Sequence, residues 1–185
     1  MSQQTWQEVL ITSQVDGPTL TAAAAASCIP PAAKITLPNN FWYIGRQLRI
    51  SASGRISNVV TTPGTARFDV RLGAVVAFDG LAVALNVVAK TNVGWWLELL
   101  LTCRAIGSGT STTLMGQGKF LSEAVVGSPL PSVGGSGQIV LPVNSAPAVG
   151  TGFDNTSANT LDLFFTQTVA TGSLTLHQYT VESLN

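Results

Sequence analysis

An alternation of polar and apolar residues over residues 47–57 constrains the fold of this chain more than any other feature. Every second residue is polar, and the residues between them are Leu48, Ile50, Ala52, Gly54 and Ile56. Successive side chains of a β-strand point to opposite faces of a sheet. The segment therefore predicts a strand with one solvent-facing side and one buried side.

Residues 67–72 repeat this alternation, with Phe68, Val70 and Leu72 on one side and charged residues on the other. The intervening residues 61–65 contain Pro-Gly, which is typical of a turn because Pro presets its φ and Gly relieves the next bend. We expect the two strands to pair as neighbours in one sheet.

Further strand candidates follow at short intervals and are separated by Gly, Pro and Asn. They are residues 6–12, 34–37, 75–78, 81–88, 93–105, 112–123, 138–143, 161–170 and 174–184. About nine to eleven short strands predict an all-β fold, a jelly-roll-like antiparallel β-sandwich. We predict a single domain over residues 1–185, with an N-terminal arm or first strand at 1–33 and a Gly/Pro-rich loop at 127–137. A break in the alternation at Leu176 and His177 indicates a bulge or a strand exposed on both sides.

Residues 72–89 are apolar enough to suggest a membrane helix, interrupted only by Asp79 and Asn86. A charged residue near the centre of such a helix costs about 2.5 to 3.5 kcal/mol, and Gly80 is a poor helix former. We therefore exclude a membrane span and predict strands joined by a tight hairpin at Asp79-Gly80.

The charge composition bears on the kind of partner. Only 10% of the residues are charged, 45% are hydrophobic, and 9 basic residues balance 9 acidic ones. A chain without a positive field lacks the basis of nonspecific nucleic-acid binding, so we exclude that partner class. A weakly charged, fairly apolar surface favours association with other proteins instead.

Few residues point to catalysis. The chain has one histidine, His177, which excludes a metal site with two or more histidine ligands from this chain, and Cys28 and Cys103 lack zinc-finger spacing. Cys103 shares the parity of the leucines before it, so we interpret it as a core residue. We predict no catalytic residue, no metal site, no cofactor and no enzymatic activity.

A glycoside hydrolase activity stays open as an alternative, because a sequence cannot place carboxylates at the separation of about 5 to 10 Å that this chemistry needs. Its candidate residues are Asp69, Asp79, Asp154 and Asp162.

Two aromatic pairs, Trp42-Tyr43 and Trp95-Trp96, are candidates for contacts with a partner. Because adjacent strand residues point in opposite directions, one ring of each pair enters the core and the other faces a loop or a partner. We interpret these rings as core and subunit interface, with a carbohydrate-stacking platform as the alternative.

Positive charge is concentrated between residues 46 and 71, where Asp69 is the only acidic residue. The basic residues there are Arg46, Arg49, Arg55, Arg67 and Arg71. Two interpretations are open: a solvated sheet face, or a basic patch that contacts an acidic surface on another subunit. The candidates for partner contact are Arg46, Arg49, Arg55, Trp42, Trp95 and Trp96.

A series of short motifs runs from residue 35 to the C-terminus. They are IGRQLRI (44–50), GRISN (54–58), TTPGT (61–65), FDVRLG (68–73), WWL (95–97) after Asn92, TCRAIG (102–107), MGQG (115–118), AVGTGFD (148–154), LHQY (176–179) and ESLN (182–185). Together they resemble a recurrent signature of small virion proteins of tailed bacteriophages.

Within that group the chain resembles capsid decoration (cement) proteins with a jelly-roll fold. The resemblance implies a non-enzymatic homotrimer on the capsid surface of the virion, which binds the major capsid protein and stabilises the assembled head. The alternative is a jelly-roll module of a tail tip or fibre that binds host glycan, and a nonviral lectin-like domain would fit the composition equally well. Residues 1–14 show no secretory signal, so we expect synthesis in the host cytoplasm, with no membrane partner.

Overall fold

In the computed structural model, residues 7–59, 61–125 and 137–184 fold into two six-stranded antiparallel sheets, with one short 3-10 helix, η1 (Pro31–Ala33). Sheet A contains, in spatial order, β1 (Glu8–Thr12), β12 (Ser173–Ser183), β4 (Gln47–Asn58), β8 (Lys90–Ala105), β9 (Thr113–Ser122) and β10 (Gln138–Leu141). Sheet B contains β2 (Ala25–Ser27), β11 (Asn159–Gln167), β5 (Thr65–Leu72) and β6 (Val75–Asp79), with β3 (Ile35–Leu37) paired to β11 and β7 (Val83–Ala84) paired to β5. The prediction of an all-β antiparallel sandwich is confirmed.

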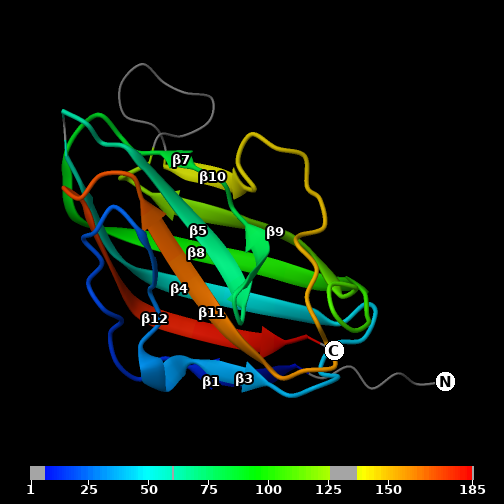
Figure 1. The fold of residues 1–185 in the computed structure, drawn as a ribbon. Coiled ribbons are helices and arrows are strands. Elements are labelled where there is room, and N and C mark those ends of the chain that lie inside the picture. The colour runs from blue at the N-terminus through cyan, green and yellow to red at the C-terminus, as the bar shows by residue number, and fades with distance from the viewer. Residues whose placement is uncertain (1–6, 60, 126–136, 185) are drawn as a thin grey trace.

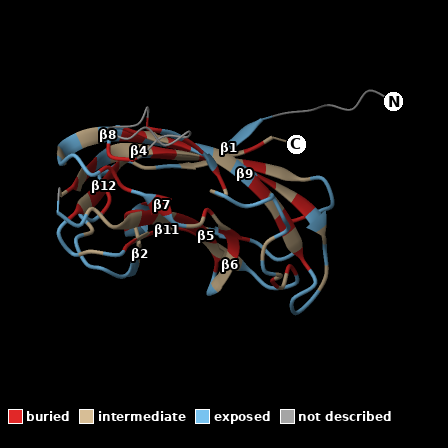
Figure 2. Ribbon diagram, turned by 90° about the horizontal axis from the view of Figure 1, so that it is seen from above, coloured by how far each residue is buried: buried red, intermediate tan, exposed pale blue. Residues whose placement is uncertain are grey.

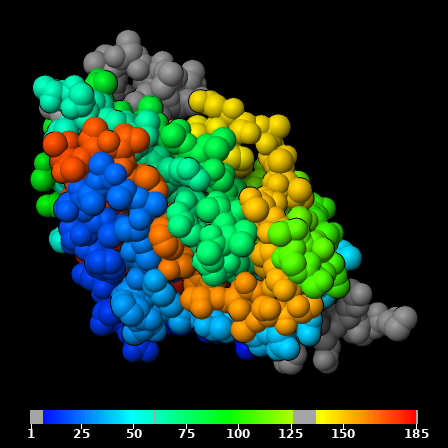
Figure 3. All heavy atoms as spheres, viewed as in Figure 1, coloured from blue at the N-terminus to red at the C-terminus, as the bar shows by residue number. Residues whose placement is uncertain are grey.

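The sheets pack face to face, and the buried residues line the space between them (Figures 1 and 2). In β4, the predicted dry side is the side that meets the core: Leu48, Ile50, Ala52 and Ile56 are all buried. On the sheet B side, the blue N-terminal segment lies beside the orange β11 (Figure 3), as the pairing of β2 and β3 with β11 requires. Residues 127–136 of the predicted Gly/Pro-rich loop lie outside the described residues.

The predicted pairing of residues 47–57 with residues 67–72 is wrong. β4 lies between β12 and β8 in sheet A, whereas β5 lies beside β11 in sheet B. Both strands bury one face, so they can meet across the core as well as edge to edge, and the turn signal at residues 61–65 fits either arrangement. The segment between them therefore crosses from one layer to the other (Figure 1).

The predicted hairpin at Asp79-Gly80 is also wrong, because β6 and β7 each pair with β5 and not with each other. The Leu81 backbone N–H donates to Asp79 Oδ1 at 2.9 Å, and Leu81 adopts a φ of 61°. The Asp79 side chain thus closes a local turn that directs the chain to a new position along β5. Within the described ranges, no helix is long and apolar enough to span a membrane.

The break in alternation at the C-terminal strand is a bulge, which is one of the two alternatives predicted for it. The register between β12 and β4 shifts between Leu176 and Gln178, so His177 has no direct partner on β4. An inserted residue reverses which side chains face outward beyond it. As a result, Leu174 and Leu176 face the core before the bulge, and Tyr179 and Val181 face it afterwards.

Both cysteines are free and buried in the described structure, which confirms that Cys103 is a core residue. The Cys28 thiol donates to the Leu163 carbonyl at 3.2 Å. Burial, and secondarily the charge of Asp162, raises the pKa of the Cys28 thiol, and burial also raises the pKa of Cys103. Because the thiolate is the reactive form, neither side chain is poised to react.

We therefore expect neither thiol to react with a disulfide reagent at neutral pH while the protein is folded, and both to react rapidly in guanidinium. Each reacting thiol releases a coloured thiolate from the reagent, and the absorbance of that product measures the rate of labelling. Fast labelling of the native protein at Cys28 or Cys103 would show that one of these sites opens readily.

Candidate binding face of sheet A

The outer face of sheet A presents cross-strand rows of side chains. In the row at its centre, Trp96 on β8 lies opposite Ser53 on β4 and opposite Leu121 on β9, and Ser53 in turn lies opposite Gln178 on β12. The next row places Ser51 between Thr180 and Glu98. Neighbouring strands lie about 4.8 Å apart, so each row brings hydroxyl, amide and aromatic groups into close reach of one another.

Trp96 presents a large aromatic ring on this face, with 45% of the residue exposed. Its neighbour Trp95 points into the core and is 3% exposed. The Trp95 indole N–H is shared between the carbonyls of Arg55 (3.2 Å) and Thr175 (3.3 Å), which fixes β8 against β4 and β12 directly beneath Trp96. The prediction that one ring of this pair is internal and the other external is confirmed.

The second aromatic pair is divided in the same way, although it lies in the loop before β4 and not in a strand. Trp42 is 2% exposed and packs against Phe41 and Phe153, whereas Tyr43 is 45% exposed. Of the three tryptophans proposed as contact residues, the structure thus places Trp42 and Trp95 inside the core. Only Trp96 among them offers a ring to a partner at the surface.

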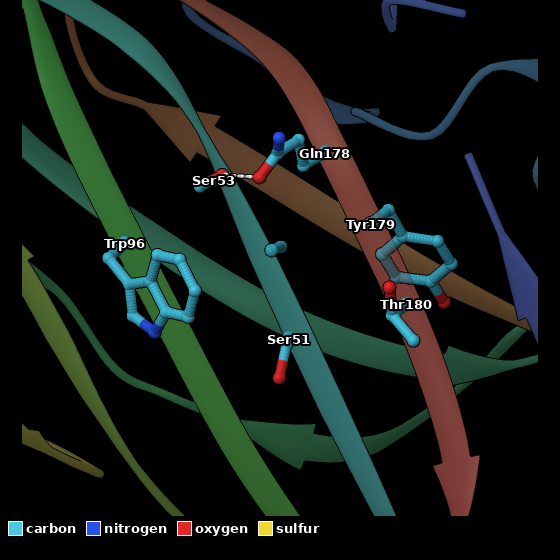
Figure 4. A pocket seen from close by; sticks show the side chains of 7 residues that line it. Ser51, Ser53, Trp96, Gln178, Tyr179 and Thr180 are labelled. Atoms are coloured by element: carbon cyan, nitrogen blue, oxygen red, sulfur yellow. Dashed lines mark hydrogen bonds between the residues drawn. The ribbon is translucent and has the colours of Figure 1, made fainter. Parts of the chain in front are cut away.

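A shallow hollow lies beside Trp96, with a volume of about 70 Å³. Its walls come from three adjacent strands: Trp96 from β8, Ser51 and Ser53 from β4, and residues 178–180 from β12 (Figure 4). The Ser53 hydroxyl donates to the Gln178 side-chain carbonyl at 3.3 Å, which orders the two polar groups facing the ring. The hollow therefore combines an apolar ring with hydrogen-bonding groups at its edge.

Most charges on this face are paired. Arg49 Nη1 lies 3.3 Å from Glu182 Oε2, and Lys119 Nζ lies 3.5 Å from Glu98 Oε2. Arg55 is exposed and forms no ion pair within the described part of the chain. The face around Trp96 is consequently close to neutral.

The predicted basic patch is split, because β4 and β5 belong to different sheets. Arg67 and Arg71 contact Asp69 in sheet B, at 3.8 Å and 3.0 Å. Arg46 is half-buried: it donates to the Phe41 carbonyl at 2.6 Å, and its guanidinium carbon lies 3.6 Å from the centre of the Phe41 ring. Burial lowers the pKa of Arg46, whose role is to hold the loop before β4. Of the three arginines proposed for partner contact, Arg49 and Arg55 lie on the outer face of sheet A.

The carboxylates considered for glycoside hydrolysis are held by local partners. Asp69 lies between two arginines, Asp79 contacts Arg67 at 2.7 Å, and Asp162 accepts from Ser27 and Lys34, both at 2.6 Å. Asp154 accepts hydrogen bonds from the hydroxyl and backbone N–H of Thr156, which lower the pKa of this carboxyl. His177 lies 2.8 Å from Asp16 at the bulge. No cluster of three or more potential metal ligands occurs in the described ranges.

Comparisons with known proteins give little beyond this geometry. No protein-family model and no curated protein matches the chain. A solved structure, the CBM2 module of the evolved Dit of Lactobacillus casei BL23 phage J-1, aligns with 82% of this chain and 69% of its own, at 13% identity and a TM-score of 0.31. A likeness at that TM-score carries no argument about fold or function.

The sequence identified Trp96 as a candidate but did not identify the polar wall of the hollow, which consists of Ser51, Ser53, Gln178 and Thr180. Gln178 and Thr180 join Trp96 only because β12 pairs with β4, and because the bulge reverses the parity of β12. The break at Leu176 and His177 was the signal that could have placed Gln178 on the outer side. Nothing in the local pattern identifies β4 as the strand beside it.

Proposed function

We propose that this chain is a non-enzymatic protein of a bacteriophage particle that binds carbohydrate through the outer face of sheet A. The carbohydrate role rests on one observation: an exposed tryptophan at the centre of the sheet, bordered by hydroxyl and amide side chains. The phage context comes from the sequence motifs between residues 35 and 185, which resemble those of virion proteins.

The chemistry of a sugar matches this surface. A pyranose ring has an apolar C–H face and a rim of hydroxyls, so it packs on an aromatic ring while its rim exchanges hydrogen bonds with nearby polar groups. Trp96 supplies the ring, and Ser51, Ser53 and Gln178 supply donors and acceptors beside it. The rigid strands beneath hold this arrangement before any ligand binds, which reduces the entropic cost of binding.

Charge distribution favours this function over docking on a head. One of the two contacts expected with the major capsid protein was an arginine patch. Its members are divided between two sheets, and Arg49, Arg67 and Arg71 are paired with carboxylates. Binding to the major capsid protein, and assembly as a homotrimer, therefore become outcomes of the same test. Neither would require sugar.

The test is the Trp96→Ala variant, assayed against an array of bacterial capsular and cell-wall polysaccharides. We expect wild-type protein to bind at least one polysaccharide saturably and the variant to bind it more than about tenfold more weakly, a loss of about 1.4 kcal/mol or more. Trp96→Phe should retain most of the affinity, because a smaller ring still stacks. Isothermal titration calorimetry gives the dissociation constants.

Tyr43→Ala is the matched control, since Tyr43 is an aromatic residue of the same exposure at a different site. It should leave affinity unchanged, and circular dichroism should be the same for all variants. Wild-type protein that binds no polysaccharide but cosediments with undecorated phage heads would replace the carbohydrate function with capsid decoration. Equal glycan binding by wild type and Trp96→Ala would remove Trp96 from the site.

A further inference from the structure

We infer, on the basis of the proposed function, that the ligand is an uncharged polysaccharide whose chain lies across the strands of sheet A, with at least one sugar unit on each side of Trp96. This goes beyond a single stacking site, because it assigns both the charge class of the ligand and its direction on the sheet. Two features carry it: a second hollow beyond Trp96, and the pairing of the charges around both hollows.

Trp96 is the shared wall of two hollows. The first opens toward β4 and β12, and is lined by Ser53 and Gln178. The second opens toward β9, and its wall includes Gly94, Leu121 and Glu123. A line through both hollows runs along the row from Gln178 through Ser53 and Trp96 to Leu121, at right angles to the strands.

Gly94 keeps the second hollow open. It lies two residues before Trp96 on the same outer side of β8, and a Cβ added there would meet no atom within 4 Å. A larger residue would place its side chain beside the Trp96 ring. The strand therefore leaves room for a sugar unit on the side of Trp96 away from the polar hollow.

The span of this row fits an oligomer. From β12 to β9 there are three strand spacings, or about 14 Å. The repeat of an extended glycan is close to one strand spacing, so a monosaccharide would occupy only part of the row. A chain of about three units would cover the row from Gln178 to Leu121.

The charges indicate a neutral ligand. Glu98 pairs with Lys119, Arg49 with Glu182, and Glu123 with Lys90 at 3.4 Å, so these groups present no net charge of either sign to the row. Two exposed arginines form no ion pair within the described residues: Arg55, which lies on β4 opposite Gly94 and lines neither hollow, and Arg104, which lies farther along β8. A site for an acidic polymer would be expected to direct several cations at successive sugar units.

The experiment measures affinity against chain length and charge. The probes are size-fractionated neutral glucans, galactans and rhamnans from dimer to hexamer, with oligogalacturonates of the same lengths as acidic counterparts. For a neutral series we expect affinity to rise by about tenfold from dimer to trimer and then level off. We also expect the dissociation constant to change less than about twofold between about 0.05 and 0.5 M NaCl.

Three variants separate the contribution of the second hollow from that of the rest of the sheet. Gly94→Leu should fill the second hollow and abolish the gain in affinity with chain length. Arg104→Leu introduces the same side chain at an exposed position farther along β8, and should behave as wild type. Arg55→Ala should change neutral-glycan affinity little.

The outcomes distinguish this inference from the proposed function. Affinity that depends on Trp96 but not on chain length, or that favours oligogalacturonates and falls steeply with salt and with Arg55→Ala, overturns the inference and leaves carbohydrate binding intact. Absence of binding to any glycan, including the bacterial polysaccharide array, overturns both.

Discussion

Phe68→Ala is expected to lower the free energy of unfolding by about 3 to 5 kcal/mol, because it removes the ring around which the core is arranged. Phe68 is 1% exposed. Its ring centre lies 5.3 Å from that of Trp95, 5.0 Å from Phe120 and 5.2 Å from Phe165. Since Trp95 and Phe120 come from sheet A and Phe165 from sheet B, the ring joins both layers. Guanidinium unfolding followed by circular dichroism measures the loss.

Phe164→Ala is the matched control for this prediction. Phe164 lies within β11 and points to its outer side, where the Arg71 guanidinium carbon lies 3.7 Å from the ring centre. A surface cation–π contact contributes about 0.5 to 1 kcal/mol, so the control should lose far less stability than Phe68→Ala. Similar losses for the two variants would mean that the interior around Phe68 is not the main source of cohesion between the sheets.

The elements and their buried sides could be predicted because both depend on local physics. Alternation alone identified which residues of β4 face the core, and parity alone separated Trp95 from Trp96. Each inference needed only the rule that neighbouring strand residues point in opposite directions. The bulge near His177 was detectable for the same reason, as a local break in that rule.

Strand partners could not be predicted, since they are decided by contacts between segments distant in sequence. β4 pairs with β12, more than a hundred residues away, and the turn signal at residues 61–65 is equally compatible with a hairpin and with a layer crossing. The misplaced arginine patch follows directly from that error, because Arg67 and Arg71 were assigned to the sheet of Arg49. The polar wall of the candidate site was lost in the same way, because Gln178 reaches Trp96 only through β4.

Gly54→Ala is expected to reduce the free energy of unfolding by about 3 kcal/mol, because the added Cβ clashes with backbone atoms of β12 and no side-chain rearrangement relieves that clash. An added Cβ would lie 2.0 Å from the Thr175 carbonyl oxygen and 2.9 Å from Leu176 Cα. Those atoms belong to β12 immediately before its bulge. Thermal and guanidinium unfolding should both show the loss, and Gly94→Ala is the control because its Cβ meets nothing within 4 Å.

The same substitution tests whether the bulge shapes the binding face. To accommodate a Cβ at Gly54, β12 must shift away from β4, and Gln178 follows directly after the bulged residue. The hydrogen bond that the Gln178 side chain accepts from Ser53 should weaken, and the hollow beside Trp96 should widen. Glycan affinity should then fall in Gly54→Ala even at temperatures where the protein is fully folded, with the Trp96 ring still in place. If stability falls while affinity is unchanged, the polar wall on β12 takes no part in recognition, and Trp96 acts without it.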